Sequence, residues 1–309
     1  MATVLFLAPA DLGETVLASG VLAHVLTRES DLASICVTDD ARPLFRAAPA
    51  LKVFTPWRNA ARLVFFAVLR GVKFDVVIDA RGSWIGRLAP AKRRIRLDVP
   101  KVLRHRIEEW TEAAGAEKAL APVILLDDKA RADAAAVVGD AAQVIVIAPG
   151  GVTADKRWAP ERFAAVARRL ASGPLAGARV VVLAAAPRDA QITRAIVSSL
   201  DADGVSARHE APDLLAAAAL MERATLCIGN DNALTHIAAA MGEPTLTLFG
   251  PTDERVRAPY GPRARTLRAR SLEEIAAQGT LDEGRAMEDV SIDAVEAAAL
   301  DLLRAGGLR

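Results

Sequence analysis

Residues 226–249 have the sequence LCIGNDNALTHIAAAMGEPTLTLF, and this stretch decides the fold. It begins with a continuously apolar run at Leu226–Ile228, passes through a polar loop into a helical pattern, and ends in a second apolar run at Thr245–Phe249. Strands that are apolar throughout, rather than at every other position, are typical of a parallel sheet buried on both faces. The strand–helix–strand order therefore predicts a doubly wound α/β fold.

The same pattern extends toward both ends of the chain. Other apolar runs predict strands at Val4–Leu7, Ser34–Val37, Val76–Ile78, Val144–Ala148 and Arg179–Leu183. Amphipathic stretches predict helices at Glu14–Leu26, Pro160–Ala171, Arg188–Leu200, Leu214–Arg223 and Ser291–Leu303. The strand series that starts at Val4 therefore starts again at Val144, after a helical connector at Lys129–Val138.

This restart predicts two Rossmann-like domains, residues 1–140 and 141–309, with the boundary at Gly139-Asp140. Doubly wound domains bind ligands at the carboxyl ends of their strands. We therefore expect the two domains to face each other across a cleft, with one continuous large sheet as the alternative. Packing of the final helix, Ser291–Leu303, back across the first domain is a further option.

In the opening stretch, the polar loop and the helix start contain the candidate donor-binding residues Asp231, Asn232, Ala233 and Leu234. Asp231 and Asn232 are residue types that cap helices. The amides of a helix start also bind phosphate, so docking of a diphosphate or a ribose is the functional interpretation. A lone histidine near a helix start is usually structural, but His236 follows a loop that should face the cleft, and we interpret it as functional.

A second strand-to-helix junction lies at residues 146–158, VIAPGGVTADKRW. Gly150 and Gly151 allow close approach of the backbone to a ligand, and Lys156 and Arg157 supply positive charge. A helix then opens with Pro160 at its first position. This combination suits a diphosphate, with a solvated basic loop as the alternative.

The first junction of the chain, residues 7–17, has the sequence LAPADLGETVL. Asp11 and Glu14 both lie where a helix begins, and a carboxylate is stabilised by the positive end of a helix. Both residues can therefore be caps. Alternatively, one of these carboxylates accepts the proton of an incoming hydroxyl as a general base.

Composition excludes several classes of protein. Of the 309 residues, 52% are apolar, and the net charge is +1, which gives no general attraction for nucleic acid. No 18-residue apolar stretch predicts a membrane span, and the start lacks the features of a signal peptide. Cys36 and Cys227 lie in apolar runs with no metal-site or disulfide spacing, which indicates core residues and a cytoplasmic location.

Basic residues gather in the first domain, and they are Lys92, Arg93, Arg94, Arg96, Lys101, Arg104, His105 and Arg106. Such a cluster favours a phosphorylated or carboxylated glycolipid at the inner membrane surface, with peripheral contact to that surface. We therefore expect Arg93 and Arg94 on the acceptor side, with an ordinary solvated loop as the alternative. Nucleic acid fits less well, because no aromatic residues interleave with the arginines.

No metal site is expected. Asp39-Asp40 follows a strand and is the one place where a metal could be argued, but a turn is the better interpretation. Protein cations and helix ends can stabilise a departing diphosphate in place of a metal ion.

At these residues the chain resembles the ADP-heptose:lipopolysaccharide heptosyltransferases of glycosyltransferase family nine. The resemblance covers nearly the whole chain and is strongest from Val144 to Gly261. It rests on the runs PGG-x5-KRW-x-PERF and GNDNALTHIAAAMGEPTLTLFGPTD, and on LGETVLASGVL near the start. Asp79-Ala80-Arg81-Gly82 is similar to a strand end that helps form the family's acceptor side, which implies an acceptor-side role for Arg81.

The resemblance implies an inverting, metal-independent GT-B glycosyltransferase of lipopolysaccharide core synthesis. Its donor would be ADP-heptose, its acceptor an anionic glycolipid, and no cofactor would be needed. Glu14 matches the family's catalytic aspartate, Lys156 its phosphate-binding lysine, and Asp231 with His236 its donor-loop pair. The chain departs from the pattern with Glu14 in place of aspartate, Asn232-Ala233 in place of threonine-glycine, and Gly20 in place of proline.

Two other functions stay open. The first is another enzyme that has the same fold and acts on nucleotide sugars. The second is a non-catalytic protein that binds a sugar nucleotide or a glycolipid, and the altered positions 14, 232 and 233 suggest it. A Rossmann oxidoreductase is disfavoured, because no G-x-G-x-x-G follows the first strand.

Overall fold

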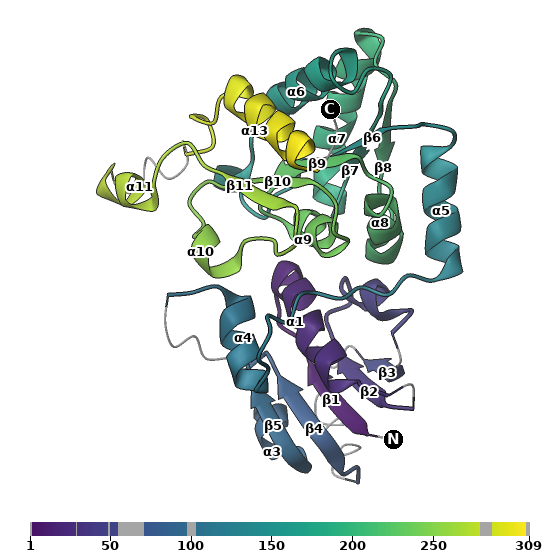
Figure 1. Cartoon of the computed structure of the whole chain (residues 1–309), viewed down its shortest axis with the longest axis vertical. Helices are drawn as coiled ribbons and strands as arrows, with labels where there is room; N and C mark the ends of the chain where they lie inside the picture. The colour runs from purple at the N-terminus through teal and green to yellow at the C-terminus, as the bar shows by residue number, and fades with distance from the viewer. Residues whose placement is uncertain are drawn as a thin grey trace. The chain divides into compact units, whose positions relative to one another are not determined.

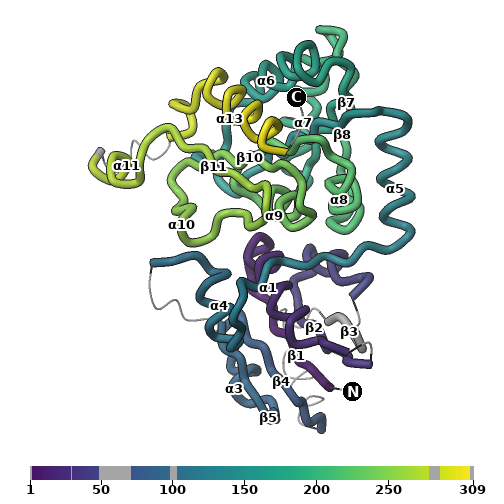
Figure 2. Tube along the Cα trace, in the orientation of Figure 1, coloured from purple at the N-terminus to yellow at the C-terminus, as the bar shows by residue number. Residues whose placement is uncertain are grey.

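The computed structural model describes residues 2–28, 30–48, 50–54, 71–97, 103–278 and 286–306. The chain divides into two compact units (Figures 1 and 2). The first unit comprises Met1–Asp127 with Arg255–Arg257, and the second comprises Asp128–Glu254 with Ala258–Arg309.

The first unit contains a parallel sheet in the order β3-β2-β1-β4-β5. Its strands are β1 (Thr3–Leu7), β2 (Leu32–Cys36), β3 (Ala50–Phe54), β4 (Phe74–Asp79) and β5 (Ala91–Arg96). Its helices are α1 (Leu12–Val25), η1 (Arg42–Phe45), α3 (Trp84–Leu88) and α4 (Arg106–Ala114). Side chains of β1, β4 and α3, among them Leu5, Phe74 and Ile85, pack into one buried cluster.

The second unit contains a parallel sheet in the order β11-β10-β9-β6-β7-β8. Its strands are β6 (Val144–Ala148), β7 (Arg179–Leu183), β8 (Ala207–Glu210), β9 (Leu226–Asn230), β10 (Thr245–Leu248) and β11 (Ala264–Leu267). Its helices are α5 (Asp128–Val138), η2 (Ala154–Lys156), α6 (Pro160–Ser172), η3 (Pro187–Asp189), α7 (Ala190–Ala202), α8 (Leu214–Met221), α9 (Ala233–Ala240), α10 (Glu254–Arg257), α11 (Leu272–Gln278) and α13 (Ile292–Ala305).

The predicted fold class is confirmed, since both units are doubly wound and parallel. Every strand that an apolar run predicts is present. The strands that the sequence did not predict are β3, β5, β8 and β11, and each of them is an edge of its sheet. Edge strands carry charged residues that discourage pairing with other chains, and β5 (AKRRIR) and β8 (ARHE) therefore lack the apolar run used for prediction. Half of the predicted basic cluster, namely Lys92, Arg93, Arg94 and Arg96, thus lies in an edge strand.

The division between the units falls before α5, whereas the predicted boundary at Gly139-Asp140 falls after it. Helix α5 packs on α8 of the second unit, and the two lie side by side in Figure 1. Its buried residues, Ala130, Ala134 and Val138, recur every four positions and so form one face of the helix. The connector therefore belongs structurally to the domain that follows it.

The final helix, α13, packs on α6 and on strands β9–β11 (Figure 1). Its buried residues Val295, Ala299, Leu302 and Leu303 belong to the core cluster of the second unit. The core contacts of this helix therefore lie within the second unit, and its packing across the first domain stays a prediction. None of the helices in the described ranges has the length and hydropathy needed to cross a membrane.

Candidate functional site

Three loops of the second unit meet at one edge of its sheet. Strands β6, β9 and β10 are neighbours and run parallel, so the loops that follow them start at the same, carboxyl edge. This edge is where doubly wound sheets bind ligands. The loop after β6 carries Gly150, Gly151 and Lys156, and the loop after β9 carries Asp231 and Asn232. The structure thus brings the predicted donor residues together.

Asp231 lies between two of the predicted residues. Its Oδ2 is 3.4 Å from Nζ of Lys156, and its Oδ1 is 3.9 Å from Nε2 of His236. Burial opposes ionisation of this carboxyl, but His236 and Lys156 together hold its pKa below the ordinary value. Asp231 is therefore a buried anion that fixes the position of Lys156.

His236 is only 3% exposed, and its Nδ1 has no hydrogen-bond partner in the described part of the chain. A buried polar atom without a partner is uncommon and costs free energy. The ring is thus held with one nitrogen toward Asp231 and the other unsatisfied, which agrees with a functional more than a purely structural histidine.

Asn232 is the cap of helix α9. Its Oδ1 accepts from the amides of Leu234 at 2.9 Å and Thr235 at 3.4 Å. The capping interpretation of Asn232 is therefore right, and two amides of the first turn already have a partner. The cap does not engage the amide of Ala233. The predicted contact between a phosphate and the first turn of this helix is therefore restricted to the amide of Ala233.

The loop after β6 is held through its carbonyl groups. Asn230 Nδ2 donates to the carbonyl of Pro149 at 2.7 Å, and Asn232 Nδ2 donates to those of Ala148 at 3.0 Å and Gly150 at 2.9 Å. Arg157 donates from Nε at 2.9 Å and from Nη2 at 2.7 Å to the carbonyl of Gly151. Arg157 was predicted as a cation for the donor, and the structure turns it toward its own loop.

The loop after β10 is held by Arg268, whose side chain is 10% exposed. Its Nη1 donates to the carbonyl of Gly250 at 2.6 Å, and its guanidinium pairs with Glu254. Arg268 and Asn230 are two residues that sequence reasoning did not single out. Asn230 is the last residue of β9 and is fully buried. In the sequence, its position next to Asp231 was the only feature that could have identified it.

In the first unit, Asp11 and Glu14 have different positions at the start of α1. Asp11 is the N-cap, and its Oδ1 accepts from the amide of Glu14 at 2.9 Å. The Glu14 carboxylate lies 3.5 Å from Nε of Arg106, whose Nη1 is 3.0 Å from Glu109. Asp11 is thus occupied in capping, whereas Glu14 is the carboxylate with its side chain free of the helix backbone.

The predicted acceptor-side arginines contact helix ends. Arg93 donates to the carbonyl of Ala114, the last residue of α4, and Arg94 donates to carbonyls of Gly86 and Ala89 at the end of α3. Cations satisfy the last carbonyls of helices in this way. Each guanidinium keeps other N–H groups, so acceptor binding by Arg93 and Arg94 stays a prediction.

Two further basic residues of the cluster are paired with carboxylates. Lys92 lies 2.7 Å from Asp75, and Arg104 pairs with Glu112. Lys101 lies outside the described residues. The backbone amide of Arg81 donates to Oδ1 of Asp79, so Arg81 lies in a turn directly after β4, at the carboxyl edge of the sheet. The basic cluster therefore has fewer unpaired positive charges for an acceptor than its sequence indicates.

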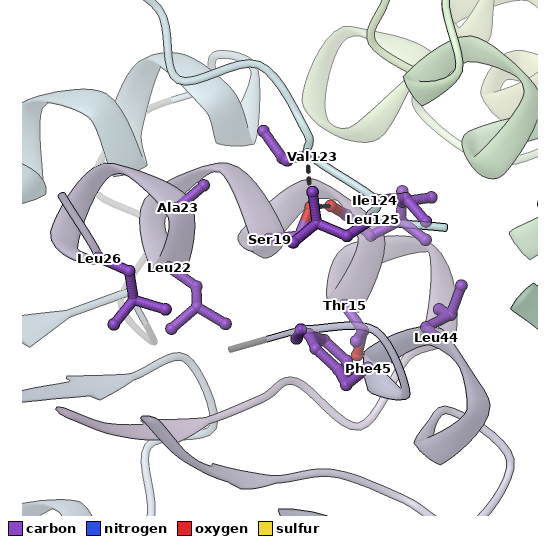
Figure 3. A pocket seen from close by; sticks show the side chains of 12 residues that line it. Thr15, Ser19, Leu22, Ala23, Leu26, Leu44, Phe45, Val123, Ile124 and Leu125 are labelled. Carbon is purple, nitrogen blue, oxygen red and sulfur yellow. Dashed lines mark hydrogen bonds between the residues drawn. The ribbon is translucent and has the colours of Figure 1, made fainter. Parts of the chain in front are cut away.

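A cavity of about 240 Å³ lies in the first unit beside α1. Figure 3 shows Leu22 of α1, Leu26 directly after that helix, Leu44 and Phe45 of η1, and the segment 123–125 around it. Ser19 Oγ donates to the carbonyl of Val16 and accepts from the amide of Val123, so its hydroxyl is already used (Figure 3). The walls are largely apolar, and none of them comes from the donor loops.

No group of three or more His, Cys, Asp or Glu side chains within the described ranges is arranged to hold a metal ion. Asp39 and Asp40 lie in the turn before η1. Cys36 and Cys227 are free and buried, and burial raises the pKa of the Cys227 thiol to about 12. Neither cysteine is therefore poised for chemistry.

The family model for glycosyltransferase family 9 (heptosyltransferase) matches residues 87–283. No curated protein matches the chain. Among solved structures, Escherichia coli ADP-heptose lps heptosyltransferase II is 18% identical with a TM-score of 0.77, covering 99% of this chain and 100% of that one.

Two further solved structures are similar. A glycosyl transferase of family 9 from Veillonella parvula DSM 2008 is 20% identical with a TM-score of 0.79, covering 98% of each chain. The E. coli heptosyltransferase WaaC with ADP is 18% identical with a TM-score of 0.73, covering 97% of this chain and 99% of that one. At these identities the likeness shows that the fold is shared.

Proposed function

The chain belongs to glycosyltransferase family 9, the heptosyltransferase family, and from that premise we propose that it transfers a heptose or a related sugar from an ADP-sugar to an anionic glycolipid. The proposed reaction inverts the anomeric configuration and uses neither a metal ion nor a cofactor. The donor is proposed by analogy with relatives whose names specify ADP-heptose or ADP. The acceptor would be of the lipopolysaccharide-core class.

One observation carries this proposal, namely the cluster of Lys156, Asp231 and His236 beside the glycine loop. The side chain of Lys156 stays 25% exposed while Asp231 pairs with its Nζ. A positioned cation next to loop amides suits the two phosphates of a nucleotide diphosphate. When the sugar leaves, negative charge grows on the diphosphate, and groups that are already in place stabilise that charge in the transition state.

Glu14 is the proposed general base. It would take the proton from the acceptor hydroxyl as the oxygen attacks the anomeric carbon from the face opposite the diphosphate. The ion pair with Arg106 orients its carboxylate. Asp11 is the weaker candidate, because its carboxylate accepts the amide hydrogen of Glu14.

The test compares Glu14→Gln with Asp11→Asn. Glu14→Gln keeps size and removes proton acceptance, so turnover should fall by about 10²–10⁴-fold while ADP affinity stays near that of the wild type. Asparagine caps helices about as well as aspartate, so Asp11→Asn should keep both stability and turnover. A collapse of turnover in Asp11→Asn with near-normal Glu14→Gln would transfer the role of base to Asp11.

A binding protein without transferase activity is the second candidate, because Asn232-Ala233 departs from the family's threonine-glycine. Such a protein would bind ADP-sugars and show no release of ADP in the presence of any glycolipid acceptor. Turnover of wild-type protein that disappears in Glu14→Gln excludes this candidate.

A further inference from the structure

Three consecutive carbonyl groups, those of Pro149, Gly150 and Gly151, are held by side chains. Asn230 Nδ2 reaches the first at 2.7 Å and the second at 3.4 Å, and Asn232 Nδ2 reaches the second at 2.9 Å. The third accepts two hydrogen bonds from Arg157. Asn230 is itself fixed, since its Oδ1 accepts from the amide of Trp158 at 3.2 Å.

The direction of these carbonyls decides the direction of the amides. A peptide unit is planar and trans, so the N–H of each residue points opposite to the carbonyl of the residue before it. The carbonyls of Pro149 and Gly150 point to the asparagine side chains, and the amides of Gly150 and Gly151 therefore point away from them. The amide of Val152 likewise points away from Arg157. Consecutive backbone amides presented in this way bind anions.

Gly150 permits this backbone path because there is no room for a side chain. A Cβ on Gly150 would lie 2.6 Å from Oδ2 of Asp189, a residue that is 1% exposed. The loop thus passes so close to Asp189 that only glycine fits, and the asparagines hold its carbonyl groups.

We propose that Asn230, Asn232 and Arg157 are positioning residues, which orient the backbone at residues 149–152 so that its amides bind the diphosphate of the donor. This inference rests on the proposed function. In this inference Arg157 acts by holding the carbonyl of Gly151, and its positive charge does not contact the phosphate. Lys156 is then the loop's charged contact, and the backbone supplies the remaining donors.

The experiment separates the charge of Arg157 from its hydrogen bond. Arg157→Gln places an amide nitrogen near the position of Nε, and so keeps a donor to Gly151 without the charge. Arg157→Met removes both. Affinity for ADP is measured by calorimetry, and Arg157→Met should weaken it about tenfold, the scale of one charge-assisted hydrogen bond. Arg157→Gln should recover most of that loss.

Asn232→Ser adds a second, independent variant. Serine caps a helix about as well as asparagine, so α9 keeps its cap while the donors to Ala148 and Gly150 are lost. The loss of two hydrogen bonds should lower the melting temperature, and ADP affinity should fall as well. The matched control is Arg162→Met, since Arg162 also donates to a backbone carbonyl, that of Val290 at 2.9 Å, on another part of the unit. It should change stability without changing ADP affinity.

Hydrogen exchange of the peptide that spans residues 149–153, measured without ligand, tests the positioning role separately. Exchange should be faster in Arg157→Met than in the wild type and in Arg157→Gln. If the wild type does not bind ADP but exchange follows this order, the positioning role stands and the proposed donor falls. Equal loss of ADP affinity in Arg157→Gln and Arg157→Met would assign Arg157 to phosphate contact and overturn the inference, as would unchanged exchange in Arg157→Met.

Discussion

Asp231 shows how a single residue organises the loops at the carboxyl edge of the second unit's sheet. The carboxylate is nearly buried, and its pKa is held below the ordinary value by His236, five residues along the chain, and by Lys156, 75 residues away. Replacement of Lys156 would leave this buried charge with His236 as its remaining ion-pair partner. Lys156 therefore affects both the ligand and the local structure.

Lys156→Ala should weaken ADP binding by about 1.5–3 kcal/mol, the scale of hydrogen bonds to charged groups. Calorimetry measures the affinity. Lys129→Ala is the matched control, because it also removes one positive charge from the second unit but lies in the exposed i,i+4 pair with Asp133. An equal loss of affinity in both variants would point to general electrostatics and not to a contact at position 156.

Asp75 is a second single residue with a tertiary role, because it links the start of β1 to β5. Its hydrogen bond with Lys92 and those from Thr3 lower the pKa of its carboxyl from 3.8 to about 2. Ionised Asp75 therefore favours the folded state above pH 4, roughly, and this stabilisation is lost as the pH falls toward about 2. Asp75→Asn should accordingly be less stable than the wild type at neutral pH, with a difference that shrinks in acid.

Urea denaturation at a series of pH values measures this difference. Asp133→Asn is the control, since it removes a carboxylate from an exposed helix pair. A difference between Asp75→Asn and the wild type that persists unchanged at about pH 2 would mean that the ionised carboxylate is not its source.

At the scale of elements, α1 is the helix that carries Glu14, and Gly20 sets how closely the chain approaches it. A Cβ on Gly20 would lie 2.3 Å from the carbonyl oxygen of Leu120 and 2.4 Å from that of Ala121. Ser19 adds a hydrogen bond from the amide of Val123 at 2.9 Å. The segment that leads to the second unit is thus attached to α1 by backbone contacts that only glycine permits.

Gly20→Ala tests this attachment, because the sign of its effect on the free energy of unfolding depends on whether the segment can move aside. In an exposed helix the change would stabilise the chain by up to about 1 kcal/mol. Here the methyl group meets backbone atoms that cannot rotate away, and we expect destabilisation of about 1–3 kcal/mol. Chemical denaturation measures the change, and a stabilised variant would show that the segment can move aside at little cost.

At the scale of the whole molecule, ligand binding should raise the melting temperature by mass action. An ADP-sugar at about 100 times its dissociation constant stabilises the folded state by about 2.7 kcal/mol. A thermal-shift panel of ADP-, UDP-, GDP- and dTDP-sugars should show the largest shift with the ADP-sugar. A larger shift with another nucleotide would replace the proposed donor.

EDTA should leave that shift and the transferase activity intact. Activity that is lost to EDTA and restored by magnesium would overturn the metal-independent mechanism.

The sequence by itself determined the central strands, the two doubly wound units and the loops at the carboxyl ends of β6 and β9. Buried central strands need continuous apolar runs, and β6 and β7 match their predicted residues in full. Gly150, Lys156 and Asp231 were identified because each lies in the segment between such a strand and the helix that follows it. The edge strands escaped prediction, because an edge does not require an apolar run and β5 instead carries four basic residues.

Only the tertiary structure decided what the side chains around those loops contact. Arg157 has the same charge whether it faces a phosphate or the carbonyl of Gly151, and the sequence does not distinguish the two. The hydrogen bonds of Asn230 and Asn232 to the glycine loop join residues 80 to 84 positions apart. Such bonds exist because parallel pairing places β6 beside β9, and neighbours in space that are distant along the chain leave no local pattern in the sequence.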